Sequence, residues 1–178
     1  AARRTLVLVH PAKTKLPSGT RFWLEPRKLD GHHHLRWDRD ADFARLARFL
    51  TGNAIGAVLG GGGARGFAHL GAIRALREAG IPIDLIGGTS MGALIAVQPA
   101  LGWDDKTMLE VNRRSFVQRK PVSLRDYTVP VYSLVDGSRL DRNLMARLGD
   151  TRIEDLWTGY FCVSSNLTRA EPMVHREG

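Results

Sequence analysis

Residues 55–92, IGAVLGGGGARGFAHLGAIRALREAGIPIDLIGGTSMG, contain two glycine-rich turns in the same local setting. The first turn spans residues 60–66 and the second spans residues 88–92. Each turn follows a short apolar run with strand character and precedes a segment with helical apolar spacing. Two strand–turn–helix units in tandem predict an α/β fold with a mainly parallel sheet. Both turns then reach the carboxyl edge of that sheet, where such folds bind ligands, and can face one another.

The second turn matches the G-x-S-x-G nucleophile elbow, with Ser90 between Gly88 and Gly92. In such an elbow the serine occupies a sharp strand-to-helix turn, and larger side chains beside it would crowd the backbone. Residues 83–87 supply the strand and residues 91–100 the helix. Ser90 is therefore the candidate nucleophile, and it lies near the positive end of a helix dipole.

The first turn offers a row of backbone N–H groups at the start of a helix predicted over residues 65–79. Such groups can hold a developing negative charge, and a serine nucleophile facing them is the minimum equipment for acyl transfer. The candidate oxyanion donors are Gly61, Gly62 and Gly63, and Arg65 and Gly66 complete the glycine-rich loop.

The same loop also fits a dinucleotide-binding fingerprint, which requires an acidic residue at the far end of the second strand. Asp84 lies at about the right distance, but it stands at the start of its strand. A phosphate-binding P-loop is excluded, because no Gly-Lys-Ser or Gly-Lys-Thr follows the glycines. A nucleotide-binding domain remains an alternative, and it predicts saturable binding of NAD or ATP.

With both turns in place, the chain resembles the patatin-like phospholipases, and most closely their neuropathy target esterase branch of lysophospholipases. Residues 58–96, with GGGGARG followed by GTSMG, carry most of the likeness. The resemblance implies a three-layer patatin-like α/β sandwich with a mainly parallel central sheet. It also implies hydrolysis of phospholipid or lysophospholipid esters through a Ser–Asp dyad, without a catalytic histidine, metal or cofactor. Weaker support comes from residues 9–11, 17–20, 32–34, 153–157, 160–161 and 173–175.

The resemblance makes Ser90 the nucleophile and places the partner aspartate in a downstream Asp-Gly-Gly or Asp-Gly-Ala motif. Asp136-Gly137-Ser138 is the Asp-Gly site with context worth testing, but it precedes residues 153–157. It also looks like a turn that opens a helix at residues 139–148, with Ser138 as the N-cap. Two options stay open: Asp136, or an aspartate beyond residue 178. In the second case the C-terminal part of the domain is missing and the chain alone is inactive.

The net charge of +8 arises from 26 basic and 18 acidic residues. Such a surface suits nucleic acid or an anionic membrane face. No nucleic-acid-binding signature is present, so we expect a membrane surface and no nucleic acid; a solvated basic surface is the plain alternative. A single cysteine, Cys162, excludes an internal disulfide framework and is expected to be a buried thiol in a strand.

No run approaches the roughly 18 apolar residues of a membrane span, and no signal peptide is visible. The expected location is the cytoplasmic side of a membrane, with any anchor outside this chain. The family likeness also suggests cyclic-nucleotide-binding-like domains upstream. The rival from another class is a catalytically incomplete membrane- or lipid-binding module.

The predicted organisation is a lead-in segment, residues 1–52, that packs on the N-terminal part of a serine hydrolase domain, residues 53–178. The lead-in is predicted to hold a strand at 4–10, loops with a short ordered crossing at 11–37 and an amphipathic helix at 40–50. We expect its tryptophans, Trp23 and Trp37, to pack on the hydrolase domain. Downstream we expect a helix at 104–119, a lid or plain connector at 120–136, a central strand at 160–167 and an edge strand at 172–175.

Two histidine features invite a catalytic or metal-binding interpretation. His32, His33 and His34 are consecutive, so they cannot all point one way in a strand or helix, and no cysteine or carboxylate cluster accompanies them. A metal site is therefore not expected. His69, three residues after Gly66, is expected to be a packing or hydrogen-bonding residue near a helix start.

Overall fold

A computed structural model describes residues 3–118 and 138–178 of the chain. The chain divides into two compact units, one of Ala1–Asp104 with Arg152–Gly178 and one of Asp105–Thr151. Asp136, Gly137 and the proposed lid at 120–136 lie outside the described residues.

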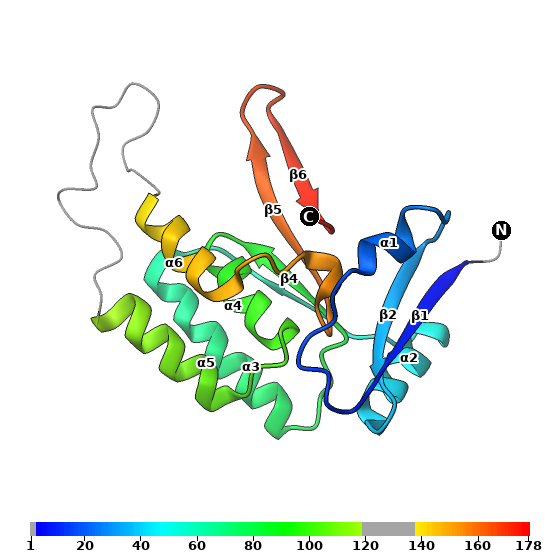
Figure 1. Cartoon of the computed structure of the whole chain (residues 1–178). Helices are drawn as coiled ribbons and strands as arrows, with labels where there is room; N and C mark the ends of the chain where they lie inside the picture. The colour runs from blue at the N-terminus through cyan, green and yellow to red at the C-terminus, as the bar shows by residue number, and fades with distance from the viewer. Residues whose placement is uncertain (1–2, 119–137) are drawn as a thin grey trace. The chain divides into compact units, whose positions relative to one another are not determined.

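The main sheet of the first unit has the strand order β3-β4-β5-β6 (Figure 1). β3 (Gly56–Leu59), β4 (Leu85–Thr89) and β5 (Gly159–Asn166) run parallel to one another. β6 (Glu171–His175) returns antiparallel beside β5 and forms one edge of the sheet. The prediction of a mainly parallel sheet with an interior strand near residue 160 is therefore confirmed.

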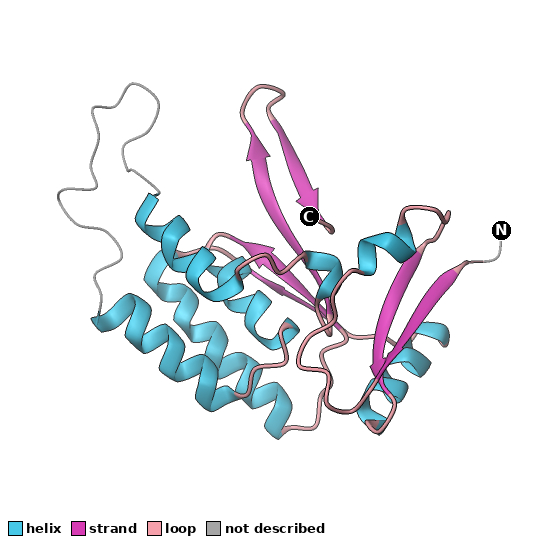
Figure 2. Cartoon of the chain, in the orientation of Figure 1, coloured by secondary structure: helices cyan, strands magenta, loops and turns pink. Residues whose placement is uncertain are grey.

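A helix follows each of the strands β3 and β4, as the glycine motifs predict (Figure 2). β3 leads into a 3-10 turn, η1 (Gly63–Phe67), and then α3 (Ala68–Glu78). β4 leads directly into α4 (Met91–Ala100), which packs against β4 and β5. α4 is the central helix of the unit, because its side chains are apolar nearly all round and Ile95 and Ala96 are fully buried.

The lead-in segment has more regular structure than its sequence predicts. β1 (Thr5–His10) and α2 (Asp40–Leu50) occupy the expected positions. The expected loops at 11–37, however, contain a short helix, α1 (Thr20–Leu24), and a strand, β2 (Gly31–Arg36), which pairs in parallel with β1. The short ordered crossing expected here is therefore α1 and β2, and β2 was not predicted as a strand because it is built largely from histidines, which do not produce an apolar alternation.

The lead-in contacts the rest of its unit through polar groups. Trp23 and Trp37, which we expected to make this contact, are 52% and 65% exposed. Instead, the Thr20 N–H donates to Asp155 Oδ1 (3.0 Å), and Trp157 Nε1 donates to the carbonyl oxygen of Lys15 (3.0 Å). Asp155 belongs to a 3-10 turn, η4 (Ile153–Asp155), which stands just before β5. These hydrogen bonds therefore connect the lead-in to the chain that enters the central strand.

The second unit contains α5 (Asp105–Asn112), a π-helical turn, η2 (Arg113–Gln118), and α6 (Ser138–Leu148). The uniform helix expected at 104–119 is thus wound differently after Asn112. Ser115 contributes to this change, since its hydroxyl donates to the carbonyl oxygen of Val111 (2.6 Å). Met108 is buried, whereas its neighbour Leu109 is 60% exposed.

Candidate active site

Ser90 occupies a strained turn between β4 and α4. Its backbone angles are φ 52° and ψ −129°, although it is not a glycine. Its carbonyl oxygen accepts hydrogen bonds from the N–H groups of Ala93 (3.0 Å) and Leu94 (3.2 Å), which begin the helix. A non-glycine residue in such a conformation costs about 1–3 kcal/mol, and such strain is concentrated at functional sites.

The two glycine motifs approach each other backbone to backbone. A Cβ added at Gly92 would overlap the carbonyl oxygens of Leu59 and Gly60, and one added at Gly88 would overlap that of Leu59. Gly88 and Gly92 have to be glycines, because the end of β3 lies too close to leave room for a side chain. This contact brings the turn after β3 directly beside the elbow.

The glycine-rich loop lies directly against the serine, as predicted for two turns at one sheet edge. A Cβ added at Gly61 would lie 3.2 Å from Ser90 Cβ. Gly66 is buried against Met91, the residue after the serine. His69 Nε2 lies 2.9 Å from the carbonyl oxygen of Gly60, so its N–H donates there and fixes the start of the loop. The predicted hydrogen-bonding role of His69 is therefore confirmed.

The two glycine turns at the carboxyl ends of β3 and β4 are exposed to solvent. Ser90, Gly61, Gly62, Gly63 and Arg65 are all exposed. Within residues 3–118 and 138–178, the structure shows no hydrogen bond to the Ser90 hydroxyl. Asp136, one of the two candidate bases, lies outside the described residues.

Asp84 precedes β4 and serves a structural purpose. It is 1% exposed and receives two hydrogen bonds from the guanidinium of Arg48 (2.8 and 2.6 Å) and one from the N–H of Ile55 (3.0 Å). Burial raises the pKa of Asp84, but the hydrogen bonds from Arg48 and Ile55 outweigh it and hold the pKa below its usual value. The carboxylate lies at the start of the strand, so it does not meet the requirement of a dinucleotide site.

A serine–histidine pair that the sequence did not reveal lies at the same end of the strands as Ser90. The last residue pair between β4 and β5 is Thr89 with Val163, so Ser164 begins the part of β5 that runs past the elbow. Its hydroxyl lies 2.7 Å from Nε2 of His175. No local motif could have announced this pair, because the register of the β5–β6 hairpin brings the two residues together. The half-buried Cys162, expected to be buried, lies on the same strand.

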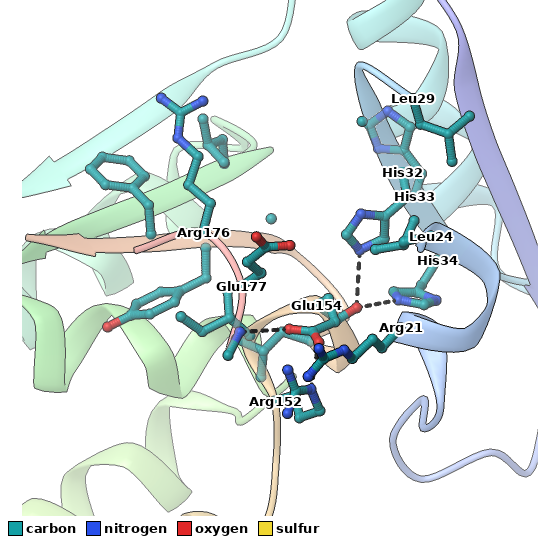
Figure 3. A pocket seen from close by; sticks show the side chains of 18 of the residues that line it. Arg21, Leu24, Leu29, His32, His33, His34, Arg152, Glu154, Arg176 and Glu177 are labelled. Atoms are coloured by element: carbon teal, nitrogen blue, oxygen red, sulfur yellow. Dashed lines mark hydrogen bonds and ion pairs between the residues drawn. The ribbon is translucent and has the colours of Figure 1, made fainter. Parts of the chain in front are cut away.

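A cavity lies at the opposite end of these strands, beside the first residues of β4 and β5 (Figure 3). Its volume is about 780 Å³, and Leu85 and Gly159 line it together with parts of the lead-in. The chain end also reaches it, where the N–H of Gly178 donates to Glu154 Oε2 (2.9 Å). This cavity is therefore separate from the Ser90 edge.

The histidine triplet borders this cavity, and two of its members are hydrogen-bond donors. His32 Nε2 and His34 Nε2 both donate to the carbonyl oxygen of Glu154, at 3.0 and 2.8 Å (Figure 3). His33 points to the other face of β2, where its ring lies 4.6 Å from that of Phe49. Among the described residues no group of three or more histidine, cysteine or acidic side chains could hold a metal ion.

His34 is neutral in this arrangement. Because its Nε2 donates to Glu154, its Nδ1 accepts a hydrogen bond from His10 Nε2 (2.8 Å). The pKa of His34 is lowered from 6.5 to about 4, mainly by burial and also by the nearby His32 and His10, against the hydrogen bond to Glu154 and the charge of Asp155.

In the part of the chain that the structure describes, no helix is long and apolar enough to cross a membrane.

Comparison with known proteins gives one family. The family model described as patatin-like phospholipase matches residues 57–176. The human patatin-like phospholipase domain-containing protein 6 is 38% identical over 99% of this chain, and the neuropathy target esterase sws of Drosophila sechellia is 35% identical over 99%. The chain spans 15% and 14% of the lengths of these two relatives. Both turns of the Ser90 edge fall inside the matched residues, and the chain belongs to the patatin-like phospholipase family.

Proposed function

We propose that the protein is a serine esterase that cleaves carboxylic esters of phospholipids or lysophospholipids through an acyl-enzyme. The observation that carries the proposal is the strained Ser90, held against the glycine loop at Gly61. Membership of the patatin-like phospholipase family supports a lipid substrate.

In the proposed reaction the Ser90 hydroxyl attacks the ester carbonyl, and an aspartate from outside the described residues accepts its proton. The negative charge that develops on the carbonyl oxygen is held by backbone N–H groups of Gly61, Gly62 and Gly63. The C–O bond to the alcohol then breaks, and the alcohol leaves with the proton. Water attacks the acyl-serine, releases the fatty acid and restores the hydroxyl. Losing one oxyanion donor typically raises the barrier by about 3–4 kcal/mol.

Arg65 and the basic surface suit an anionic lipid substrate. Arg65 is exposed in the glycine-rich loop, close to where the ester would sit, and can bind a lipid phosphate. The net charge of +8 favours the cytoplasmic, anionic face of a membrane. We place the protein there, and we assign cyclic-nucleotide-binding-like domains to the upstream part of the longer protein. The much greater length of the relatives leaves room for them.

Fluorophosphonate labelling of the full-length protein tests the proposal. We expect a label that disappears in Ser90→Ala while the circular dichroism spectrum stays unchanged. Ser164→Ala is the matched control, since Ser164 is a second serine at the same edge and lies beside His175. It should keep the label. A label that persists in Ser90→Ala would overturn the assignment of the nucleophile.

The second candidate is a lipid-binding module without catalysis. It is favoured by one observation, namely that the Ser90 hydroxyl has no hydrogen-bond partner within the described ranges. A folded, full-length protein that takes no label and hydrolyses no lysophospholipid would support this candidate and reject the esterase.

A further inference from the structure

The short helix α1 exposes its aromatic side chains to solvent. Phe22 is 82% exposed and Trp23 is 52% exposed, whereas the polar Thr20 of the same helix is only 1% exposed. An ordinary surface helix shows the reverse arrangement, with apolar side chains inward. We call Phe22 and Trp23 the aromatic face of α1.

The orientation of α1 is fixed by hydrogen bonds to buried groups. The Thr20 N–H donates to Asp155 Oδ1 (3.0 Å), and Thr20 Oγ1 lies 3.4 Å from His34 Nε2. Asp155 and His34 are themselves buried, at 6% and 2% exposure. The aromatic face is thus held outward by a rigid support, so its exposure belongs to the folded state.

A basic side chain lies against the aromatic face. The guanidinium of Arg27 lies 5.4 Å from the centre of the Trp23 ring and donates to the Trp23 carbonyl oxygen (2.7 Å). Lys28 follows in sequence. Residues 1–52 contain 11 basic and five acidic residues, so they carry +6 of the total charge of +8. The positive charge of the protein is therefore concentrated in the segment that presents these aromatics.

We propose that the aromatic face of α1 docks on the surface of an anionic phospholipid bilayer. Phe22 and Trp23 enter the headgroup region, where aromatic rings are favoured, while Arg27 and its basic neighbours bind lipid phosphates and carboxylates. An uncharged partner surface would leave Arg27 and the net positive charge of residues 1–52 without a counterpart. The inference rests on the proposed lipid substrate, but it concerns a different surface.

The docking surface and the candidate nucleophile lie at opposite ends of the strands β4 and β5. α1 is hydrogen-bonded to η4, which precedes β5, and the first residue of β5 pairs with the first residue of β4. Ser90 follows the last residue of β4. Docking through α1 therefore anchors the protein without covering Ser90, which remains accessible to single-chain lipids that leave the bilayer.

Sedimentation with large vesicles tests the docking site. The full chain is incubated with vesicles of phosphatidylcholine alone or mixed with phosphatidylserine, at low and at raised salt. We expect binding only to the mixed vesicles, weakening as salt screens the charges. Phe22→Ser should lower the partition coefficient about tenfold, since a buried aromatic ring is lost from the interface. Arg27→Gln should lower it about fivefold.

Matched controls use similar residues elsewhere. Trp37→Ser removes another exposed tryptophan, and Arg169→Gln removes an exposed arginine that lies 3.7 Å from Glu171. Neither change should alter partition. Equal binding to both vesicle types, unchanged binding of Phe22→Ser, or equal loss in Trp37→Ser would each overturn the proposal.

The same samples separate this inference from the esterase proposal. Phe22→Ser should keep fluorophosphonate labelling and the hydrolysis of a short-chain soluble ester, because it leaves the Ser90 edge intact. If the parent protein binds vesicles through α1 but takes no label, the esterase fails and the docking site stands. If it takes the label but Phe22→Ser binds normally, the docking site fails alone.

Discussion

The backbone conformation of Ser90 lowers the stability of the protein, whereas its hydroxyl is needed for the proposed reaction. At φ 52° and ψ −129° a serine pays a conformational cost that a glycine does not. We expect Ser90→Gly to raise the free energy of unfolding by about 1 kcal/mol, which is roughly 2–4 °C in Tm, while abolishing fluorophosphonate labelling. Thermal unfolding followed by circular dichroism measures the first effect.

A serine in a regular strand supplies the comparison for this experiment. Ser164 lies within β5, so Ser164→Gly should lower Tm, because glycine weakens the interior of a strand. A fall in Tm for Ser90→Gly of the same size would mean that the elbow is not strained.

His34 should make the stability of the fold depend on pH. The pKa of the buried imidazole is about 4, against 6.5 when exposed, mainly because burial disfavours the charged form. The unfolded chain therefore takes up this proton at a higher pH than the folded chain. The contribution of His34 is complete above pH 6.5 and is lost as the pH falls toward 4, by about 3 kcal/mol in total. Urea unfolding at a series of pH values measures this slope.

Histidine variants distinguish the contribution of His34 to the pH dependence of unfolding from those of its neighbours. Asp155 favours the charged form of His34, whereas His32 and His10 disfavour it. His34→Gln should flatten the slope between pH 6.5 and 4. His33→Gln should change the slope less, because His33 lies on the other face of β2 and is only half-buried. An unchanged slope in His34→Gln would show that this residue does not control acid stability.

At the scale of elements, the Arg48–Asp84 pair joins α2 to the starts of β3 and β4. Asp84 also binds the N–H of Ile55, just before β3, so one carboxylate aligns both strands that lead to the glycine turns. Arg48→Met should lower the free energy of unfolding by about 3 kcal/mol, because it leaves the buried Asp84 without its cation. Arg74→Met, at an exposed pair with Glu78, should cost less than about 1 kcal/mol. Similar decreases in the free energy of unfolding of the two variants would show that the pair of Arg48 with Asp84 does not stabilise the fold more than an exposed pair does.

The elements nearest the glycine motifs were predictable because their signals are local. The strand before each turn, the helix after it and the break at the end of α3 all follow from residues a few positions apart. β2 was not predictable, because His32 and His34 become good inward-facing residues only when the Glu154 carbonyl accepts their N–H groups. The π-helical turn η2 was likewise not predictable, because apolar spacing does not report a change in helical winding or the hydrogen bond from the Ser115 hydroxyl to Val111.

The arrangement around Ser90 was also predictable in outline. Parallel strands place both turns at one edge, and the close contact of Gly61 with Ser90 agrees with that expectation. The pair formed by Ser164 and His175 and the exposure of Phe22 depend on which segments meet across the fold. Such long-range contacts leave no spacing pattern in a single sequence, so they had to come from the structure.

For the whole first unit, the lead-in should be required for folding. Trp157 is 3% exposed, and three of its contacts come from the lead-in: His10 packs on its edge, Arg36 lies 4.2 Å above its ring, and Lys15 accepts its N–H. Removing residues 1–52 would expose one side of this ring, at a cost of about 2 kcal/mol from its apolar area, and would remove the cation of the buried Asp84 as well. A typical domain has only about 5–15 kcal/mol of stability to lose.

The chain of residues 53–178 should therefore lack a cooperative unfolding transition and a native near-ultraviolet circular dichroism spectrum. Adding residues 1–52 as a separate polypeptide should restore both, since the hydrogen bonds to Asp155, Glu154 and Asp84 need no covalent connection. The Asp84 contact can be tested within the same experiment, because a lead-in polypeptide carrying Arg48→Met should restore the fold less well. A cooperative transition in residues 53–178 alone would contradict the prediction and make the lead-in an independent attachment to the sheet.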